Sequence, residues 1–223
     1  MTTVAIMQPY FVPYGGYFRL LQAADRFVLY DCVQFPRRGW VHRNRLSDRN
    51  GDLSWLTLPL QKAKREARIE ELSFARERLS DFEADWARFP ALSPGQLDGH
   101  PLRAELLDFS GSPVDYIERL LRRCSDILGI ACEWVRSSSL DIDPALRAEE
   151  RILAIAESQG AKTYINAPGG RELYQADSFQ SRGIELLFLS PWKGNYASIV
   201  ERIATEEPED LSSEIREQSE GRA

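Results

Sequence analysis

Residues 3–31 read "TVAIMQPYFVPYGGYFRLLQAADRFVLYD", and this stretch decides the fold. The apolar run 3–7 predicts a short buried strand, and residues 26–31 predict a second strand. Between them, residues 15–24 carry apolar side chains at helical spacing. A strand, a helix and a strand in this order are typical of a parallel βαβ unit, whose sheet is covered on both faces.

The rest of the chain repeats this alternation. Further strands are predicted at 53–60, 69–74, 130–137, 161–166 and 184–189, and further helices at 77–89, 113–129, 143–160 and 171–183. We therefore predict an α/β fold: a mostly parallel sheet with helices on both faces, Rossmann-like, in a single domain over residues 1–205. The acidic and polar residues 206–223 are predicted to be a short helix or a disordered tail.

The composition argues against a nucleic-acid-binding protein, a membrane-spanning protein and a metal-binding protein. The net charge of −6 argues against a general nucleic-acid binder, which needs a basic surface. No run approaches the roughly 20 apolar residues of a membrane span, and the N-terminus does not resemble a secretory signal. The three cysteines, Cys32, Cys124 and Cys132, lack metal-ligand spacing, as do the histidines, so we predict no metal site and a cytoplasmic location.

Ligands of open parallel sheets bind beyond the carboxyl ends of the strands. That rule selects the segments 8–16, 31–45, 137–142 and 166–172. In the first of them, prolines stiffen the chain and glycines allow a close approach of the backbone. Such a turn either packs its aromatic rings into the core or offers Gln8, Tyr10 and Tyr14 to a ligand as uncharged hydrogen-bonding groups.

The second segment contains a cationic cluster, "RRGWVHRNR" at residues 37–45. Guanidinium groups suit phosphate and carboxylate, so Arg38, Arg43 and Arg45 are candidates for holding a small anionic substrate. The alternative is a solvated or internally paired run of charge. If the segment is extended, Arg38 and His42 share one face and Arg43 and Arg45 the other.

His42, Asp31 and Gln8 are the predicted catalytic residues, with His42 or Asp31 as the base. A structural role for His42, and a salt bridge of Asp31 to the arginines, are the competing interpretations. The predicted substrate-binding residues are Tyr10, Tyr14, Gly16, Tyr17, Gln34, Arg38, Trp40, Arg43, Asn44, Arg45, Ser138, Asn166, Gly169 and Gly170.

A family resemblance covers residues 6–46, "IMQPYFVPYGGYFRLLQAADRFVLYDCVQFPRRGWVHRNRL". The order and spacing of its motifs resemble the opening of the WbqC-like proteins, bacterial proteins associated with O-antigen and other surface-polysaccharide genes. The matching segments are Gln8–Pro9, Phe11–Pro13, Gly16–Phe18, Ala24–Val28, Asp31–Phe35 and Trp40–Arg45. The chain departs from the family at Cys32, where a second acid is usual, and at His42, where Asn is frequent.

The resemblance implies a group-transfer enzyme that forms an amide or ester on an amino-sugar, a nucleotide-sugar or a similar small acceptor. The start of the chain also resembles the nucleotidyltransferase and pantothenate-synthetase group, without its ATP-binding histidine. Two alternatives therefore stay open: an ATP-dependent ligase or nucleotidyltransferase that uses the same crevice, with ATP as its cofactor, and a non-catalytic binding or scaffold protein.

Overall fold

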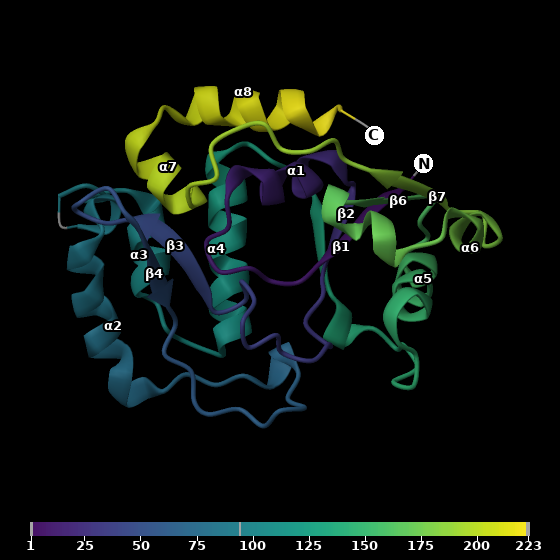
Figure 1. Cartoon of the computed structure of the whole chain (residues 1–223), viewed down its shortest axis with the longest axis horizontal. Coiled ribbons are helices and arrows are strands. Elements are labelled where there is room, and N and C mark those ends of the chain that lie inside the picture. The colour runs from purple at the N-terminus through teal and green to yellow at the C-terminus, as the bar shows by residue number, and fades with distance from the viewer. Residues whose placement is uncertain (1, 94, 222–223) are drawn as a thin grey trace.

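The computed structural model describes residues 2–93 and 95–221, and a five-stranded parallel sheet forms its centre (Figure 1). The strands are β1 (Thr3–Met7), β2 (Arg26–Leu29), β5 (Glu133–Arg136), β6 (Thr163–Asn166) and β7 (Glu185–Phe188). Their spatial order is β5-β2-β1-β6-β7. In the central strand β1, Ala5 lies opposite Phe27 on one side and Ile165 on the other. The predicted α/β class and parallel sheet are confirmed.

Helices cover both faces of the sheet, because alternate side chains of β1 point to opposite sides. Ala5 belongs to the larger core, which the sheet shares with α1 (Gly15–Ala23) and α4 (Pro113–Ile127). Val4 and Ile6 face the smaller core under α5 (Ala148–Ser158) and α6 (Ala176–Gln180). This arrangement places α1 and α5 on opposite faces, and both helices connect strands of the same sheet.

Two helices show how local sequence sets an element's start. At α4, Ser112 and Asp115 form a capping box around Pro113, which explains why the predicted start is right. At α5 the predicted start at Asp143 is wrong. Ala148 has a φ of 45°, a left-handed backbone that interrupts the turn capped by Asp143, so the helix begins there instead.

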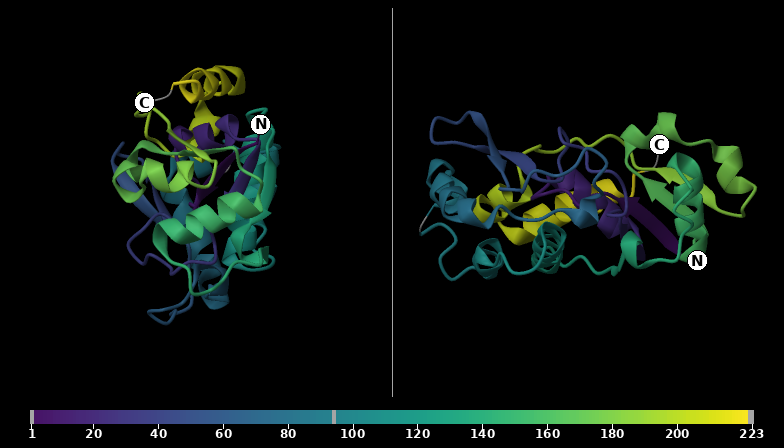
Figure 2. Two further views of the ribbon diagram at one scale, coloured as in Figure 1. Left: turned by 90° about the vertical axis from the view of Figure 1, so that its right-hand side faces the viewer. Right: turned by 90° about the horizontal axis from the view of Figure 1, so that it is seen from below.

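The middle of the chain differs most from prediction. Strands β3 (Arg43–Ser47) and β4 (Leu53–Thr57) form an antiparallel hairpin outside the parallel sheet. The predicted strand 69–74 is wrong, because it begins with the 3₁₀ helix Ile69–Glu71. The predicted helix 77–89 is shortened to α2 (Leu79–Asp85) between 3₁₀ turns, and an unpredicted helix follows, α3 (Pro101–Leu107). The hairpin, α2 and α3 lie at the opposite end of the molecule from α5 and α6 (Figures 1 and 2).

The C-terminal part adds α7 (Ile199–Thr205) and α8 (Pro208–Ser219). Helix α8 packs along α1 and buries Leu211 and Ile215 (Figure 1). The buried Arg202 guanidinium lies 2.6 Å from both Glu206 and Glu214 and so joins α7 to α8. Most of the segment for which a short helix or disorder was predicted is therefore one packed helix, and residues 222–223 lie outside the described residues.

Across the described ranges, every helix is too short or too polar to cross a lipid bilayer. The predicted helix over 171–183 is divided into the 3₁₀ helix Pro168–Leu173 and the short α6.

Candidate functional site

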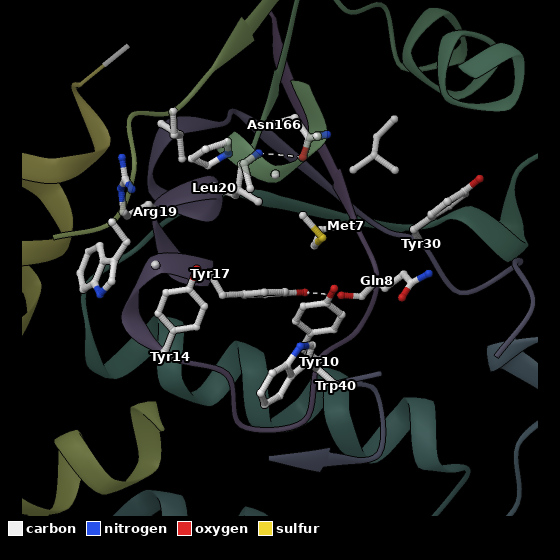
Figure 3. A pocket seen from close by; sticks show the side chains of 18 of the residues that line it. Met7, Gln8, Tyr10, Tyr14, Tyr17, Arg19, Leu20, Tyr30, Trp40 and Asn166 are labelled. Atoms are coloured by element: carbon white, nitrogen blue, oxygen red, sulfur yellow. Dashed lines mark hydrogen bonds between the residues drawn. The ribbon is translucent and has the colours of Figure 1, made fainter. Parts of the chain in front are cut away.

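A pocket of about 690 Å³ opens at the carboxyl ends of the strands (Figure 3). Its position follows from the strand order. The chain leaves β1 toward β2 on one side, while β6 and β7 extend the sheet on the other, so the connections diverge between β1 and β6. Ligands of open α/β sheets bind at such a switch point. Gln8 follows β1, Tyr30 follows β2 and Asn166 ends β6, and each lines the pocket.

Aromatic side chains dominate the lining. They come from the segment after β1, from α1, from the segment before β3 and from the loops after β6 and β7: Tyr10, Tyr14, Tyr17, Tyr30, Trp40, Tyr174, Trp192 and Tyr196. Several of the rings contact one another, with Tyr14 stacked on Tyr196 at 5.1 Å between centroids and Tyr10 at 5.5 Å from Tyr17. The pocket therefore offers flat apolar faces edged by hydroxyl groups.

The segment after β1 is pinned in a strained shape. Val12 is buried and has a φ of 39°, which a β-branched residue adopts only under constraint. The Asn44 side-chain amide donates to the carbonyls of Phe11 at 3.0 Å and Val12 at 2.8 Å. The Ser198 hydroxyl also donates to Val12, at 2.7 Å. These bonds offset the strain and fix the directions of Tyr10 and Tyr14.

Two glycines keep the pocket open by allowing close approach. A Cβ on Gly16 would lie 2.2 Å from the ring of Tyr14, and one on Gly170 would lie 2.5 Å from Nδ2 of Asn166. A larger residue at either place forces its neighbour to move. The Asn166 Oδ1 accepts from the backbone N–H of Ala167 at 2.7 Å, which holds its side chain at the pocket wall.

The pocket is nearly uncharged. Burial raises the pKa of Tyr10, and burial followed by the proximity of Tyr196 raises the pKa of Tyr14. Burial also raises the pKa of Tyr17 and of Tyr30, so all these hydroxyls stay neutral at physiological pH. Among the described lining residues there is no Asp, Glu, His, Cys or Lys, and Arg19 is the single charged group.

Arg19 is already engaged with the protein. Its guanidinium donates to the carbonyls of Gln218 and Ser190, each at 2.9 Å, and lies 5.7 Å from the centre of the Trp192 ring. It ties the C-terminal helix to the loop after β7. The arrangement suits a neutral, ring-shaped ligand held by stacking and by uncharged hydrogen bonds.

The structure brings many of the predicted site residues to this pocket and places the others elsewhere. The lining contains Gln8, Tyr10, Tyr14, Gly16, Tyr17, Trp40, Asn166, Gly169 and Gly170. The lining does not contain Asp31, Gln34, Arg38, His42, Arg43, Asn44, Arg45 or Ser138. The carboxyl-end rule therefore selected the edge of the sheet where this pocket opens, but it did not separate residues that line the pocket from residues that support them.

Asp31 is fully buried and joins two strand ends. Its carboxylate accepts from the Ser137 hydroxyl at 2.9 Å and from the backbone N–H and hydroxyl of Ser138 at 2.9 and 2.7 Å. These donors belong to the 3₁₀ helix Ser137–Ser139, which follows β5. Among the described residues Asp31 forms no salt bridge to the arginine cluster, and its carboxylate instead joins the ends of β2 and β5.

His42 lies in the turn before β3 and packs its ring edge-on against Phe35, 5.0 Å between centroids. Burial, and secondly the charge of Arg43, lower the pKa of His42 to about 4. Its imidazole is therefore neutral at physiological pH and is a weak base. Its Nδ1 atom is buried without a hydrogen-bond partner among the described residues.

Residues 36–42 form turns and bends, so the predicted alternation of faces applies only from Arg43 onward. Gln34 lies outside the pocket and donates from Nε2 to the Arg65 carbonyl at 2.7 Å. Arg38 is exposed to solvent. Arg43 and Arg45 lie on the outer side of the hairpin with two indole rings. We call Trp40, Arg43, Arg45 and Trp55 the Trp–Arg patch.

Four aromatic residues of the pocket lie outside the predicted substrate-binding set: Tyr30, Tyr174, Trp192 and Tyr196. Tyr30 follows β2 directly and falls under the carboxyl-end rule, so its position was available from the sequence. Trp192 and Tyr196 come from the loop after β7, which the same rule covers. Over the part of the chain that is described, no three His, Cys, Asp or Glu side chains lie close enough to hold a metal ion.

Comparison with known proteins agrees with the motifs of residues 6–46. A Mycobacterium tuberculosis protein named "Uncharacterized protein Rv1507c" is 28% identical over 204 residues, covering 83% of this chain and 81% of that protein. No solved structure matches the chain. The model of the WbqC-like protein family matches residues 8–202, a span that includes the pocket and its supporting residues. The chain belongs to the WbqC-like protein family.

Proposed function

We propose that the protein is a group-transfer enzyme that joins an acyl or amino-acyl group to a sugar-type acceptor bound in the pocket. The observation that carries this proposal is the aromatic, nearly uncharged pocket at the switch point between β1 and β6. Aromatic faces pack against the apolar side of a sugar ring, and the amides of Gln8 and Asn166 suit its hydroxyl groups. The implied link to surface polysaccharides and a cytoplasmic location are part of the proposal.

The chemistry fits a pocket without a strong base. An amine of the acceptor attacks the carbonyl carbon of an activated donor such as a thioester. The C–N bond forms and the C–S bond breaks, sulfur leaves with the bonding electrons, and the amine proton passes to it through solvent. The pocket contributes by orienting the two reactants and by donating neutral hydrogen bonds to the carbonyl oxygen as its negative charge grows.

Of the predicted catalytic residues, Gln8 is the one assigned a role in this pocket, as a hydrogen-bond donor to acceptor or carbonyl. The buried bonds of Asp31 favour a role in holding the strand ends. His42 is assigned to the support of the hairpin, where it contacts Phe35.

An ATP-dependent ligase is the second candidate. Arg45 favours it, since it lies beside Trp40 of the pocket wall, and Arg43 lies next to Arg45 on the Trp55 ring. Both guanidinium groups suit a phosphate chain. The two candidates differ in what is consumed: the ligase splits ATP, whereas the transferase uses a donor that is already activated.

The test incubates the purified protein with amino-sugar nucleotides and with acyl or aminoacyl thioesters, with and without ATP and magnesium. Mass spectrometry follows the acceptor. A mass gain without ATP is the expected result, and Asn166→Leu should remove most of it. A product that requires ATP splitting would replace the proposal with the ligase. Absence of any product would contradict both candidates, and a thermal shift with an acceptor would then favour a binding protein.

A further inference from the structure

We infer that the Trp–Arg patch is a second subsite, which binds the phosphate groups of a ligand whose ring end occupies the pocket. The ligand class is a sugar joined to a nucleoside diphosphate. This inference rests on the proposed function, because it names the activated form in which the acceptor arrives. The hairpin exposes arginines and indole rings on one face, and these arginines have no acidic partner among the described residues. Trp40 connects this face to the pocket, whose own lining is nearly uncharged.

The hairpin has two different faces, as the period of a strand requires. The inner face carries Leu46 and Leu56, which are buried in the core. The outer face carries Arg43, Arg45 and Trp55, and in the register of the hairpin Arg45 lies directly opposite Trp55. Trp55 is 41% exposed and Trp40 is 38% exposed. Large rings left open on an outer face are typical of a binding surface.

The indoles hold the guanidinium groups in place. The guanidinium carbon of Arg43 lies 4.2 Å from the centre of the Trp55 ring, and that of Arg45 lies 5.6 Å from Trp55 and 5.8 Å from Trp40. Arg43 also donates to the carbonyls of Arg38 at 2.9 Å and of Gly39 at 3.4 Å, which leaves part of its N–H groups for a ligand. Stacking on a ring orients a guanidinium without using its charge on an acid, so the N–H groups of Arg45 and the remaining ones of Arg43 stay available to an anion.

These cations lack acidic partners. Within the described ranges no ion pair involves Arg43 or Arg45, although Arg26, Arg182 and Arg202 each pair with glutamate. The chain carries a net charge of −6, so acids are not scarce. Because two neighbouring cations without acidic partners repel each other, an anionic ligand bound between them is favourable.

Trp40 connects the two subsites. It lines the pocket (Figure 3). Its ring also lies beside the guanidinium of Arg45 and 5.4 Å from the ring of Trp55. A ligand that extends past Trp40 passes from neutral walls to unpaired arginines. Among the described residues that line the pocket, Arg19 is the single cation that a phosphate could meet, and it already donates to two carbonyls. The charges therefore assign the ring to the pocket and the phosphates to the patch.

The test measures the affinity of uridine, guanosine, adenosine and thymidine diphosphates, and of the four uncharged nucleosides, by calorimetric titration. The variant is Arg43→Gln/Arg45→Gln. The matched control is Arg49→Gln/Arg65→Gln, which removes the same charge from two exposed arginines outside the patch. We expect at least one diphosphate to bind tighter than its nucleoside, and the patch variant to weaken that diphosphate about tenfold or more. The control variant should retain its affinity within about twofold.

Several outcomes would overturn the inference. The first is that every diphosphate binds with the same affinity as its nucleoside. The second is that the patch variant and the control variant lose the same affinity for the diphosphate. The third is that a single-stranded oligonucleotide binds through the patch while no diphosphate binds. The proposed function fails separately. If the patch variant loses diphosphate binding and no transfer product forms, the subsite stands and the transferase does not. If transfer occurs and the patch variant performs it with unchanged affinity, the transferase stands and the subsite does not.

Discussion

The pocket and the Trp–Arg patch share Trp40 but differ in charge, burial and support. The pocket is enclosed by loops from four strand ends, and its polar groups are neutral. The patch lies on one exposed face of a two-stranded hairpin, and its polar groups are cationic. The comparison teaches that the predicted binding residues are divided between two regions of different charge. Arg43 and Arg45 lie on the patch, whereas Asn44 between them supports the segment after β1, because a strand turns successive side chains to opposite faces.

The largest expected effect is on the free energy of unfolding, at a buried residue that supports the strand ends behind the pocket. Asp31→Ala should lower the free energy of unfolding by about 3 kcal/mol, because it leaves the buried hydroxyl of Ser137 without its acceptor and breaks both hydrogen bonds from Ser138. Urea unfolding measures the change. The control Asp98→Ala, at an exposed acid 3.6 Å from Arg103, should stay within about 0.5 kcal/mol. A loss at Asp31 no larger than at Asp98 would show that the strand ends do not depend on this carboxylate.

The hairpin provides a test within three consecutive residues. Asn44→Ala should lower the free energy of unfolding by about 2 kcal/mol, because the carbonyls of Phe11 and the strained Val12 lose their buried donor. Arg43→Gln and Arg45→Gln should each change it by no more than about 0.5 kcal/mol, because these side chains lie on the solvent face. The measurement is chemical unfolding of the three variants. Equal losses at all three positions would contradict the division of the hairpin into a supporting and a binding face.

His42 should make stability depend on pH. Its pKa is about 4 in the folded protein against 6.5 for the free side chain, so the unfolded chain binds a proton first as pH falls. The free energy of unfolding should therefore decline between pH 6.5 and pH 4, by about 1–2 kcal/mol after allowance for partial exposure.

His42→Asn should remove that part of the decline. The comparison uses the wild type and the variant in urea at pH 7 and at pH 4.5. Parallel losses of stability in the two proteins would show that His42 titrates normally in the folded state.

Much of the fold follows from the sequence. The alternation of apolar strands and amphipathic helices gives the parallel sheet, and Ser112, Pro113 and Gly129 mark the ends of α4. The region from 69 to 107 could not be assigned in the same way, because short 3₁₀ turns and the seven-residue α3 leave no long periodic pattern. The late start of α5 depends on the φ of Ala148, which no residue type signals.

Part of the candidate site could also be predicted from the sequence, because the order of strands and helices locates the strand ends. A rule about strand ends selects segments, and it selected those that supply Gln8, Tyr10 and Asn166. It does not say whether a side chain points into the opening or away from it. Asp31 is turned toward Ser137, and Asn44 toward the carbonyl of Val12, and both directions depend on tertiary contacts between distant segments.

The central claim is that the pocket binds the ring end of the ligand, and Gln8 and Gln34 test it most directly. Both were predicted from the sequence to take part, yet only Gln8 lines the pocket. The measurement is calorimetric titration of the wild type, Gln8→Leu and Gln34→Leu with UDP-, GDP- and dTDP-linked sugars. Gln8→Leu should weaken the tightest of these about tenfold, the loss of one buried hydrogen bond, while Gln34→Leu leaves it unchanged. Unchanged affinity in Gln8→Leu, or an equal loss in Gln34→Leu, would contradict the claim.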